Sequence, residues 1–174
     1  MDIKDIRVFI CVPGVGKTHL CNMDNRFVDM DNEKAFYKYD FKNLSSYEFE
    51  NKKGNRGTPI NNNSVKYIKN LTFDLLTNTN KILLYAPNPQ IVEMIYDYKI
   101  PYCLVYHSLD CISEYKIRMK NRGNTDNFIE SMLGDSVIYD FYNASLTDKR
   151  PSFKIELKPK QYLSDVLLNI FKIS

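Results

Sequence analysis

Short apolar runs alternate with amphipathic segments along most of this chain. Five of the runs have the length and composition of strands, and the first is apolar apart from Arg7, as a parallel strand buried on both faces requires. The predicted strands cover residues 6–12, 26–31, 81–86, 102–107 and 153–157. Glycine, proline and polar residues punctuate the chain between them.

The segments between these runs show apolar residues at helical spacing. Helices are predicted at residues 17–23, 64–75, 89–98, 109–121, 124–147 and 163–171, with a helical turn or two at residues 32–39. Ser64 can cap the second of these helices, and Gly134 is expected to break the long one.

Strands that alternate with helices predict a single α/β domain over residues 1–174, with a parallel sheet covered by helices on both faces. In such a sheet, ligands bind at the carboxyl ends of the strands. Residues at about 40–60 are polar and aromatic and contain Gly54, Gly57 and Pro59, so we expect an irregular excursion there. That excursion could hold a substrate cap.

The turn after the first predicted strand carries a phosphate-binding pattern. Residues 11–18 read Cys-Val-Pro-Gly-Val-Gly-Lys-Thr and meet G-x-x-x-x-G-K-[ST] everywhere except at Cys11, which replaces the first glycine. The glycines let backbone N–H groups turn toward an anion, the lysine can reach the terminal phosphates, and the threonine can ligate Mg²⁺. The predicted nucleotide-binding residues are Pro13, Gly14, Val15, Gly16, Lys17 and Thr18.

A plain strand-to-helix turn is the alternative interpretation of these residues. It requires neither the Lys-Thr pair nor an apolar strand immediately before the glycines. Cys11 is small enough for the turn, provided that the backbone there does not need a positive φ, which only glycine adopts freely.

The pattern V-P-G-V-G-K-T, an acidic end to the second strand and a later arginine-bearing helix resemble the P-loop kinases of small molecules, above all the nucleoside monophosphate kinase-like group. The resemblance in the order of elements covers most of the chain. It implies a three-layer α/β sandwich with five parallel strands in the order 2-3-1-4-5. It also implies ATP as phosphoryl donor with Mg²⁺, a substrate-binding excursion after strand two and a lid at about residues 116–126.

Two carboxylates stand at the end of the second predicted strand. Asp29 and Asp31 point to the same face of an extended strand and can reach a site beside the phosphate loop. Asp29 is predicted to bind the metal with Thr18, and Asp31 to handle the acceptor; one of the two would be the base for a hydroxyl acceptor. The alternative is a solvated strand end with Asp31 capping the next helix. Nucleoside monophosphate kinases commonly carry an acid after the third strand, which is absent from residues 84–88 here.

Arg118 and Arg122 lie four residues apart on a predicted helix that Gly123 ends. They could clamp one anion together and stabilise the charge of phosphoryl transfer, which makes them catalytic candidates. The alternative is a solvated basic helix face. Arg56, in the excursion, is the natural partner for an acceptor phosphate, although a flexible basic loop has the same pattern.

Composition narrows the class of protein. The chain has 174 residues, 44% of them hydrophobic, and a net charge of +3, which does not favour stable nucleic-acid binding. Its four cysteines show no C-x-x-C spacing, and no apolar run approaches the roughly 20 residues of a membrane span. We therefore expect a soluble cytoplasmic protein, and the abundance of Asn, Lys, Ile and Tyr suggests an AT-rich genome such as that of a phage.

His19 and His107 form no recognisable catalytic pair.

Three functions remain open at this point. A nucleoside or deoxynucleoside monophosphate kinase is favoured by size, the lid-like arginines and Arg56. A kinase of a hydroxyl group, on a small metabolite or a polynucleotide 5′ end, is favoured by Asp29 and Asp31. A nucleotide-binding switch or ATPase is the third, and Cys11 leaves room for a binding protein without turnover.

Overall fold

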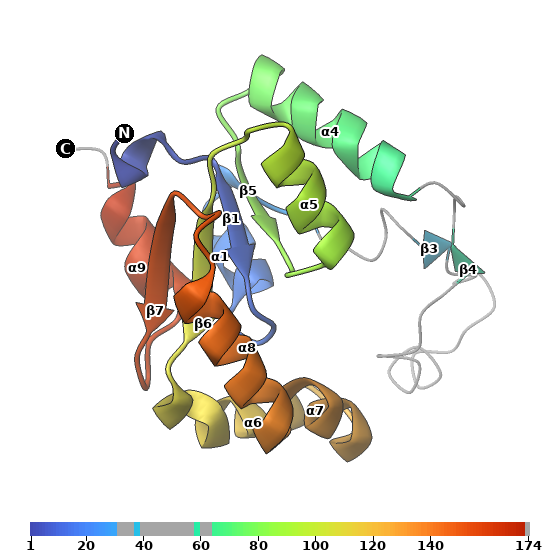
Figure 1. Ribbon diagram of the computed structural model, residues 1–174, viewed down its shortest axis with the longest axis vertical. Coiled ribbons are helices and arrows are strands. Elements are labelled where there is room, and N and C mark those ends of the chain that lie inside the picture. The colour runs from blue at the N-terminus through green and yellow to red at the C-terminus, as the bar shows by residue number, and fades with distance from the viewer. Residues whose placement is uncertain (31–36, 39–57, 60–63, 173–174) are drawn as a thin grey trace.

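A computed structural model describes residues 1–30, 37–38, 58–59 and 64–172 of the chain. Five strands among these residues form one parallel sheet (Figure 1). They are β1 (Val8–Cys11), β2 (Phe27–Asp29), β5 (Ile82–Tyr85), β6 (Cys103–His107) and β7 (Phe153–Leu157). Their order across the sheet is β2-β5-β1-β6-β7, which confirms the predicted order 2-3-1-4-5.

A second, two-stranded antiparallel sheet pairs β3 (Tyr37–Lys38) with β4 (Thr58–Pro59). The helical turn predicted at residues 32–39 is therefore wrong at Tyr37 and Lys38, where strand pairing outweighs local helix preference. The rest of that segment and most of the excursion predicted at about 40–60 lie outside the described residues.

Helices occupy the segments at 17–23, 64–75, 89–98, 109–121, 124–147 and 163–171 whose apolar spacing predicted them, and η1 (Ile3–Asp5) is an additional short helix that was not predicted. They are η1 (Ile3–Asp5), α1 (Lys17–Met23), α4 (Ser64–Asn78), α5 (Pro89–Asp97), η3 (Leu109–Cys111), α6 (Ile112–Asn121), α7 (Asp126–Leu133), α8 (Asp135–Thr147) and α9 (Leu163–Ile170). Ser64 is the first residue of α4 rather than its cap. Asn88 caps α5 by accepting the N–H of Gln90 at 2.9 Å, with Pro89 at the first helical position.

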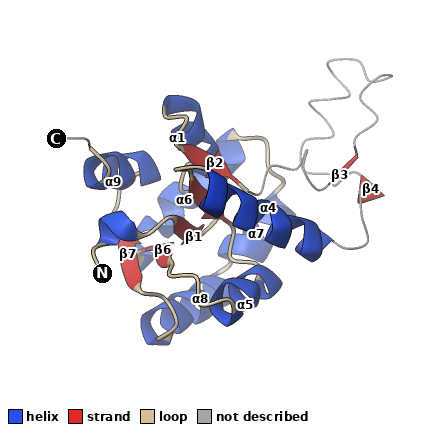
Figure 2. Cartoon of the chain, turned by 90° about the horizontal axis from the view of Figure 1, so that it is seen from above, coloured by secondary structure: helices blue, strands red, loops and turns tan. Residues whose placement is uncertain are grey.

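Helices cover the sheet on both faces because strand side chains alternate between them. On one face, Phe9 of β1 contacts Phe171 at the end of α9, with ring centroids 5.9 Å apart. On the other, Tyr85 Oη lies 2.5 Å from Oγ1 of Thr72 on α4. Figure 2 shows α1 and α9 on the first side and α4, α5 and α8 on the second, so the chain folds as a three-layer sandwich.

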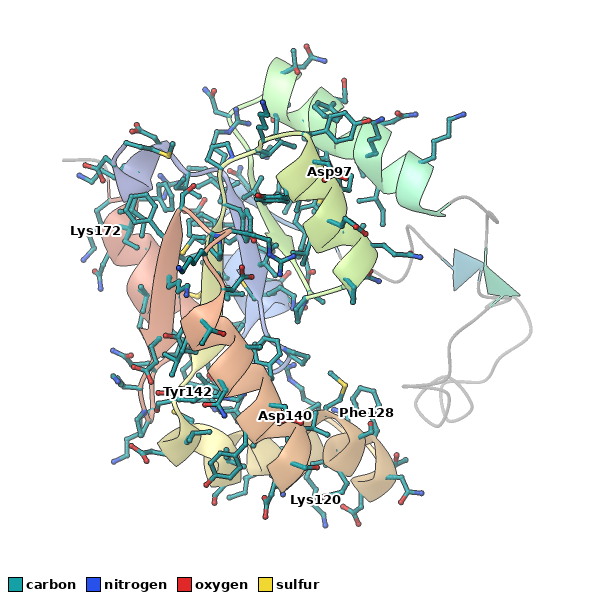
Figure 3. The ribbon with its side chains drawn as sticks, viewed as in Figure 1. Asp97, Lys120, Phe128, Asp140, Tyr142 and Lys172 are labelled. Atoms are coloured by element: carbon teal, nitrogen blue, oxygen red, sulfur yellow. The ribbon has the colours of Figure 1, made fainter. Side chains whose placement is uncertain are left out.

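The carboxyl ends of the main strands meet at one edge of the sheet, beside α6 and α7 (Figure 1). Figure 3 places Lys120 on α6 and Phe128 on α7 at that end, and Asp97 of α5 at the opposite end. β1 is fully buried and is the middle strand of the sheet, so the loop that follows it lies at the centre of this edge. No helix in the described part of the chain is long and apolar enough to cross a membrane.

Candidate functional site

The loop between β1 and α1 has the backbone that an anion site requires. Gly14 has φ of +85° and Gly16 has φ of +98°, both in the left-handed region that residues with a Cβ rarely adopt. Left-handed residues in a tight turn form concavities lined by backbone N–H groups, which bind anions. The sequence pattern and the backbone conformation therefore agree at both glycines.

The phosphate loop is supported from below by an aromatic ring. A Cβ on Gly14 would lie 2.9 Å from Cδ1 of Tyr115, a fully buried residue of α6. From the other side, the N–H of Leu163 donates to the carbonyl of Val15 at 3.0 Å. Segments from two later parts of the chain thus hold the loop in place.

Cys11 occupies a position that does not need glycine. It is the last residue of β1, fully buried, and it pairs with Val105 in the sheet. Among the described residues other than glycine, only Lys99 and Lys160 have a positive φ. The extended backbone at Cys11 accepts any side chain that fits, and the thiol fits.

Lys17 and Thr18 open α1, next to the loop. The Nζ of Lys17 donates to the carbonyl oxygen of Cys11 at 3.3 Å, so the lysine side chain folds back over the loop. Thr18 Oγ1 donates to Oδ2 of Asp29 at 2.8 Å. Asp29 reaches it because β2 ends beside β5, in register with Leu84.

Thr18 and Asp29 fit a magnesium ion that is shared with phosphates. Mg²⁺ prefers oxygen ligands and usually binds through one or two protein groups, several waters and substrate phosphates. The hydroxyl and the carboxylate supply two such oxygens on the phosphate-loop side of the sheet. No cluster of three or more His, Cys, Asp or Glu that could hold a metal ion by itself occurs among the described residues.

Arg118 is held in place by its neighbours. Its side chain is 11% exposed and pairs with Glu114, one turn earlier on α6. The guanidinium carbon lies 3.7 Å from the ring centroid of Tyr162 and 4.7 Å from that of Tyr115. The N–H of Lys160 and the guanidinium of Arg118 together hold the pKa of the Glu114 carboxyl below its usual value. Arg118 thus ties α6 to the loop that precedes α9.

Arg122 has a different environment, and the shared anion clamp that the spacing of the two arginines suggested stays a prediction. The side chain of Arg122 is exposed and forms no hydrogen bond or ion pair within the described part of the chain. It lines a hollow of about 480 Å³ with Gly16, His19 and Tyr162. Arg118 is held by its stacking on Tyr162 and its ion pair with Glu114, whereas Arg122, four residues later, faces solvent.

Replacing each arginine with methionine should separate these roles. Arg118→Met removes two ring contacts and an ion pair from a nearly buried site, so we expect the free energy of unfolding to fall by about 1–3 kcal/mol. Arg122→Met should change it by less than about 0.5 kcal/mol. Urea denaturation of both variants measures the difference, and equal losses would contradict the positioning role of Arg118.

Tyr115 and Tyr162 are the functional neighbours that the sequence did not single out. Tyr162 is 42% exposed, and its Cδ1 lies 3.6 Å from where a Cβ on Gly16 would be. The sequence feature that could have identified Tyr162 is its position immediately before the last amphipathic helix. Arg56 and Asp31, which the sequence proposed for the acceptor, lie outside the described residues.

His107 does not have the setting of a catalytic base, whereas His19 is exposed and lines the hollow beside Gly16. His107 is 3% exposed, and its ring centroid lies 4.6 Å from that of Tyr115. Burial lowers the pKa of His107 and keeps it neutral. The cysteines Cys11, Cys103 and Cys111 are buried, and burial raises the pKa of the Cys21 thiol to about 11, so that thiol is unreactive at neutral pH.

The lowered pKa of His107 predicts a pH-dependent stability. The unfolded chain binds this proton before the folded chain does, so stability is complete above about pH 6.5 and falls as the pH drops below it. One proton gives a slope of at most about 1.4 kcal/mol per pH unit. Between pH 7 and pH 5, the free energy of unfolding should fall less in His107→Gln than in the wild type. An equal fall would show that other groups cause the pH dependence.

Comparison with known proteins gives no family to which the chain can be assigned. No protein-family model matches the sequence, and no curated protein matches it significantly.

Proposed function

We propose that the protein is a magnesium-dependent phosphotransferase that uses ATP as donor and a nucleoside or deoxynucleoside monophosphate as acceptor. The observation that carries the proposal is the conformation of the loop. Gly14 and Gly16 are left-handed, Lys17 lies over the loop, and Thr18 is bonded to Asp29. A structural turn alone would not need a lysine and a hydroxyl–carboxylate pair at the same place.

Each part of the loop has a role in this proposal. The backbone from Pro13 to Thr18 surrounds the β- and γ-phosphates, and Lys17 stabilises the negative charge that spreads over the transferred group. Thr18 and Asp29 hold Mg²⁺, which neutralises charge on the phosphate oxygens when it is bound. The hollow beside Gly16 is the place for the base, with Tyr162 as a stacking surface and Arg122 at the rim.

The transfer itself requires little covalent chemistry from the protein. An oxygen of the acceptor attacks the γ-phosphorus, and the bond to the oxygen bridging the β- and γ-phosphates breaks, leaving ADP. A phosphate acceptor is already anionic and needs positive charge, for which Arg56 and Arg122 are the candidates. Catalysis then depends on positioning and on charge stabilisation.

A hydroxyl acceptor is the second candidate, and one observation favours it. β5 is followed by Ala86, Pro87 and Asn88, so no carboxylate stands at that strand end. Asp29 is the carboxylate that the described structure places against the loop. A hydroxyl loses a proton as it attacks, and Asp29 or Asp31 would accept it.

An ADP-release assay against a panel of acceptors tests the proposal. The panel contains ribo- and deoxynucleoside monophosphates, nucleosides, small alcohols and 5′-hydroxyl oligonucleotides, each with ATP and Mg²⁺. Turnover on a monophosphate supports the first candidate, and turnover on hydroxyl acceptors alone supports the second. Tight ATP binding without turnover on any acceptor would reject both in favour of a nucleotide-binding protein or an ATPase.

Asp29→Asn should raise the magnesium concentration needed for half-maximal activity by about 10-fold or more, because an amide ligates Mg²⁺ far more weakly than a carboxylate does. The amide still accepts the Thr18 hydrogen bond, so the fold should be unaffected. Titrating Mg²⁺ at saturating ATP measures the shift. An unchanged titration curve would remove Asp29 from the metal site.

A further inference from the structure

A cavity of about 390 Å³ lies between α5 and α8. Ile10 of β1 and Leu104 of β6 form its floor, and Val92 of α5 and Phe141 of α8 line its walls. Its volume is within the roughly 300–1,000 Å³ that small-molecule sites occupy. The floor is apolar, and the polar lining residues are Glu93, Tyr102, Ser145, Asp148 and Arg150, a mixture of apolar surface and polar groups that is usual in small-molecule sites.

The cavity is separate from the phosphate loop. Ile10 pairs with Tyr85, whose hydroxyl contacts α4, so Ile10 faces the α4, α5 and α8 side of the sheet. Thr18 belongs to α1, which covers the opposite side, as Figure 2 shows. An occupant of the cavity therefore does not compete for the phosphate-binding groups.

One polar atom of the lining has no partner. Tyr102 is 2% exposed, and its hydroxyl is buried without a hydrogen bond in the described structure. Buried polar groups are normally hydrogen-bonded, so an isolated hydroxyl beside a cavity indicates a missing partner. Burial, with a smaller contribution from Asp148, raises the pKa of Tyr102 to about 12, so the phenol is a donor at neutral pH.

The charges at the cavity favour an uncharged ligand. Arg150 donates from Nε and Nη2 to the two carboxylate oxygens of Asp148 at 2.9 and 2.8 Å, so these two residues neutralise each other. Glu93 also lines the cavity; it is exposed, and its side chain forms no hydrogen bond or ion pair with a described residue. The unpaired carboxylate repels anions and offers an acceptor to N–H groups of a ligand.

We propose that this cavity binds an unphosphorylated nucleobase or nucleoside. A base supplies the three features that the lining requires: flat apolar faces for Val92 and Phe141, a ring carbonyl or ring nitrogen to accept from Tyr102, and N–H groups for Glu93. A nucleotide carries phosphate charges that Glu93 disfavours. The proposal does not rest on phosphoryl transfer, because the site lies on the other face of the sheet.

Titration of the isotope-labelled full chain with adenosine, guanosine, thymidine and uridine, followed by amide NMR, tests the proposal. At least one nucleoside should shift the amides around Val92 and Ala144. Its 5′-monophosphate should bind the same place at least several-fold more weakly. The Lys17→Ala variant should respond in the same way, which separates this cavity from the phosphate loop.

Variants supply the specific readout. Tyr102→Phe should weaken nucleoside binding about 3- to 10-fold, as the loss of one hydrogen bond predicts. It should leave the thermal midpoint unchanged or raise it, because the hydroxyl that it removes has no partner. Tyr139→Phe, on the exposed surface of α8, is the matched control and should bind as the wild type does. Ala144→Phe should fill the cavity and abolish binding.

Three results would overturn the proposal. One is the absence of shifts at α5 and α8 with every nucleoside at millimolar concentration. Another is equal binding of nucleosides and their monophosphates in the cavity. The third is a lower thermal midpoint in Tyr102→Phe with unchanged nucleoside binding, which would show that the hydroxyl serves the fold.

Discussion

Lys17→Ala is expected to lower the rate of phosphoryl transfer by about 10²–10³-fold, the usual cost of removing one group that stabilises developing charge. Lys17 lies at the first position of α1, and its Nζ donates to the carbonyl of Cys11. In the proposed reaction, this ammonium would stabilise the negative charge on the transferred group. Alanine keeps the helix, because it has the best helix propensity of all residues.

The assay for this variant needs a stability measurement and a lysine control. ADP release gives the rate, and circular dichroism with thermal melting reports the fold. Lys66→Ala, on the exposed surface of α4, removes the same charge far from the loop and should leave the rate unchanged. A Lys17→Ala protein that is folded and fully active would show that residues 11–18 do not bind the reacting phosphates.

Gly14→Ala is expected to reduce the free energy of unfolding by about 2–5 kcal/mol. Alanine at a φ of +85° costs about 1–2 kcal/mol in backbone strain. The added Cβ also meets the ring of Tyr115 at 2.9 Å, and overpacking of this kind costs about 1–3 kcal/mol more. Tyr115 is fully buried, so its ring cannot move aside without disturbing α6.

Gly123 provides a matched control for this substitution. Its φ is +82°, but a Cβ there would have no atom within 4 Å. Gly123→Ala should therefore lose only the strain component, about 1–2 kcal/mol. Adding Tyr115→Leu to Gly14→Ala should cost less than the sum of the two single changes, because the clash is removed. Urea denaturation measures the free energy of unfolding of both variants. Equal decreases would show that contact with the Tyr115 ring adds nothing to the cost of Gly14→Ala.

The fold was predictable because its signals are local. The apolar runs that became β1 and β6 are continuous, and each is separated from the next strand by a segment of helical period. The strand order was predicted from resemblance to a known kinase group, and the observed order of the five strands agrees with it. The pairing of β3 with β4 was not predicted, because a strand of two residues is too short to show a hydrophobic period.

The candidate site was predictable only where its chemistry is contiguous in sequence. The loop at residues 11–18 carries its own pattern, whereas the contact of Tyr115 with Gly14 joins residues from distant parts of the chain. The two environments of Arg118 and Arg122 are also decided by tertiary contacts. Helical spacing predicts that two side chains lie on one face of a helix, but it does not predict which of them stacks on an aromatic ring from another segment.

The support of the phosphate loop has a consequence for synthesis of the protein. Domains fold as units, and during translation the amino-terminal residues leave the ribosome first. The loop therefore emerges before Leu163, whose N–H donates to the carbonyl of Val15, and before Tyr162, which lies against Gly16. A nascent chain that stops before β7 would carry the complete phosphate-binding sequence without its supports. Under the proposed function, ATP binding should therefore begin only after α9 is made.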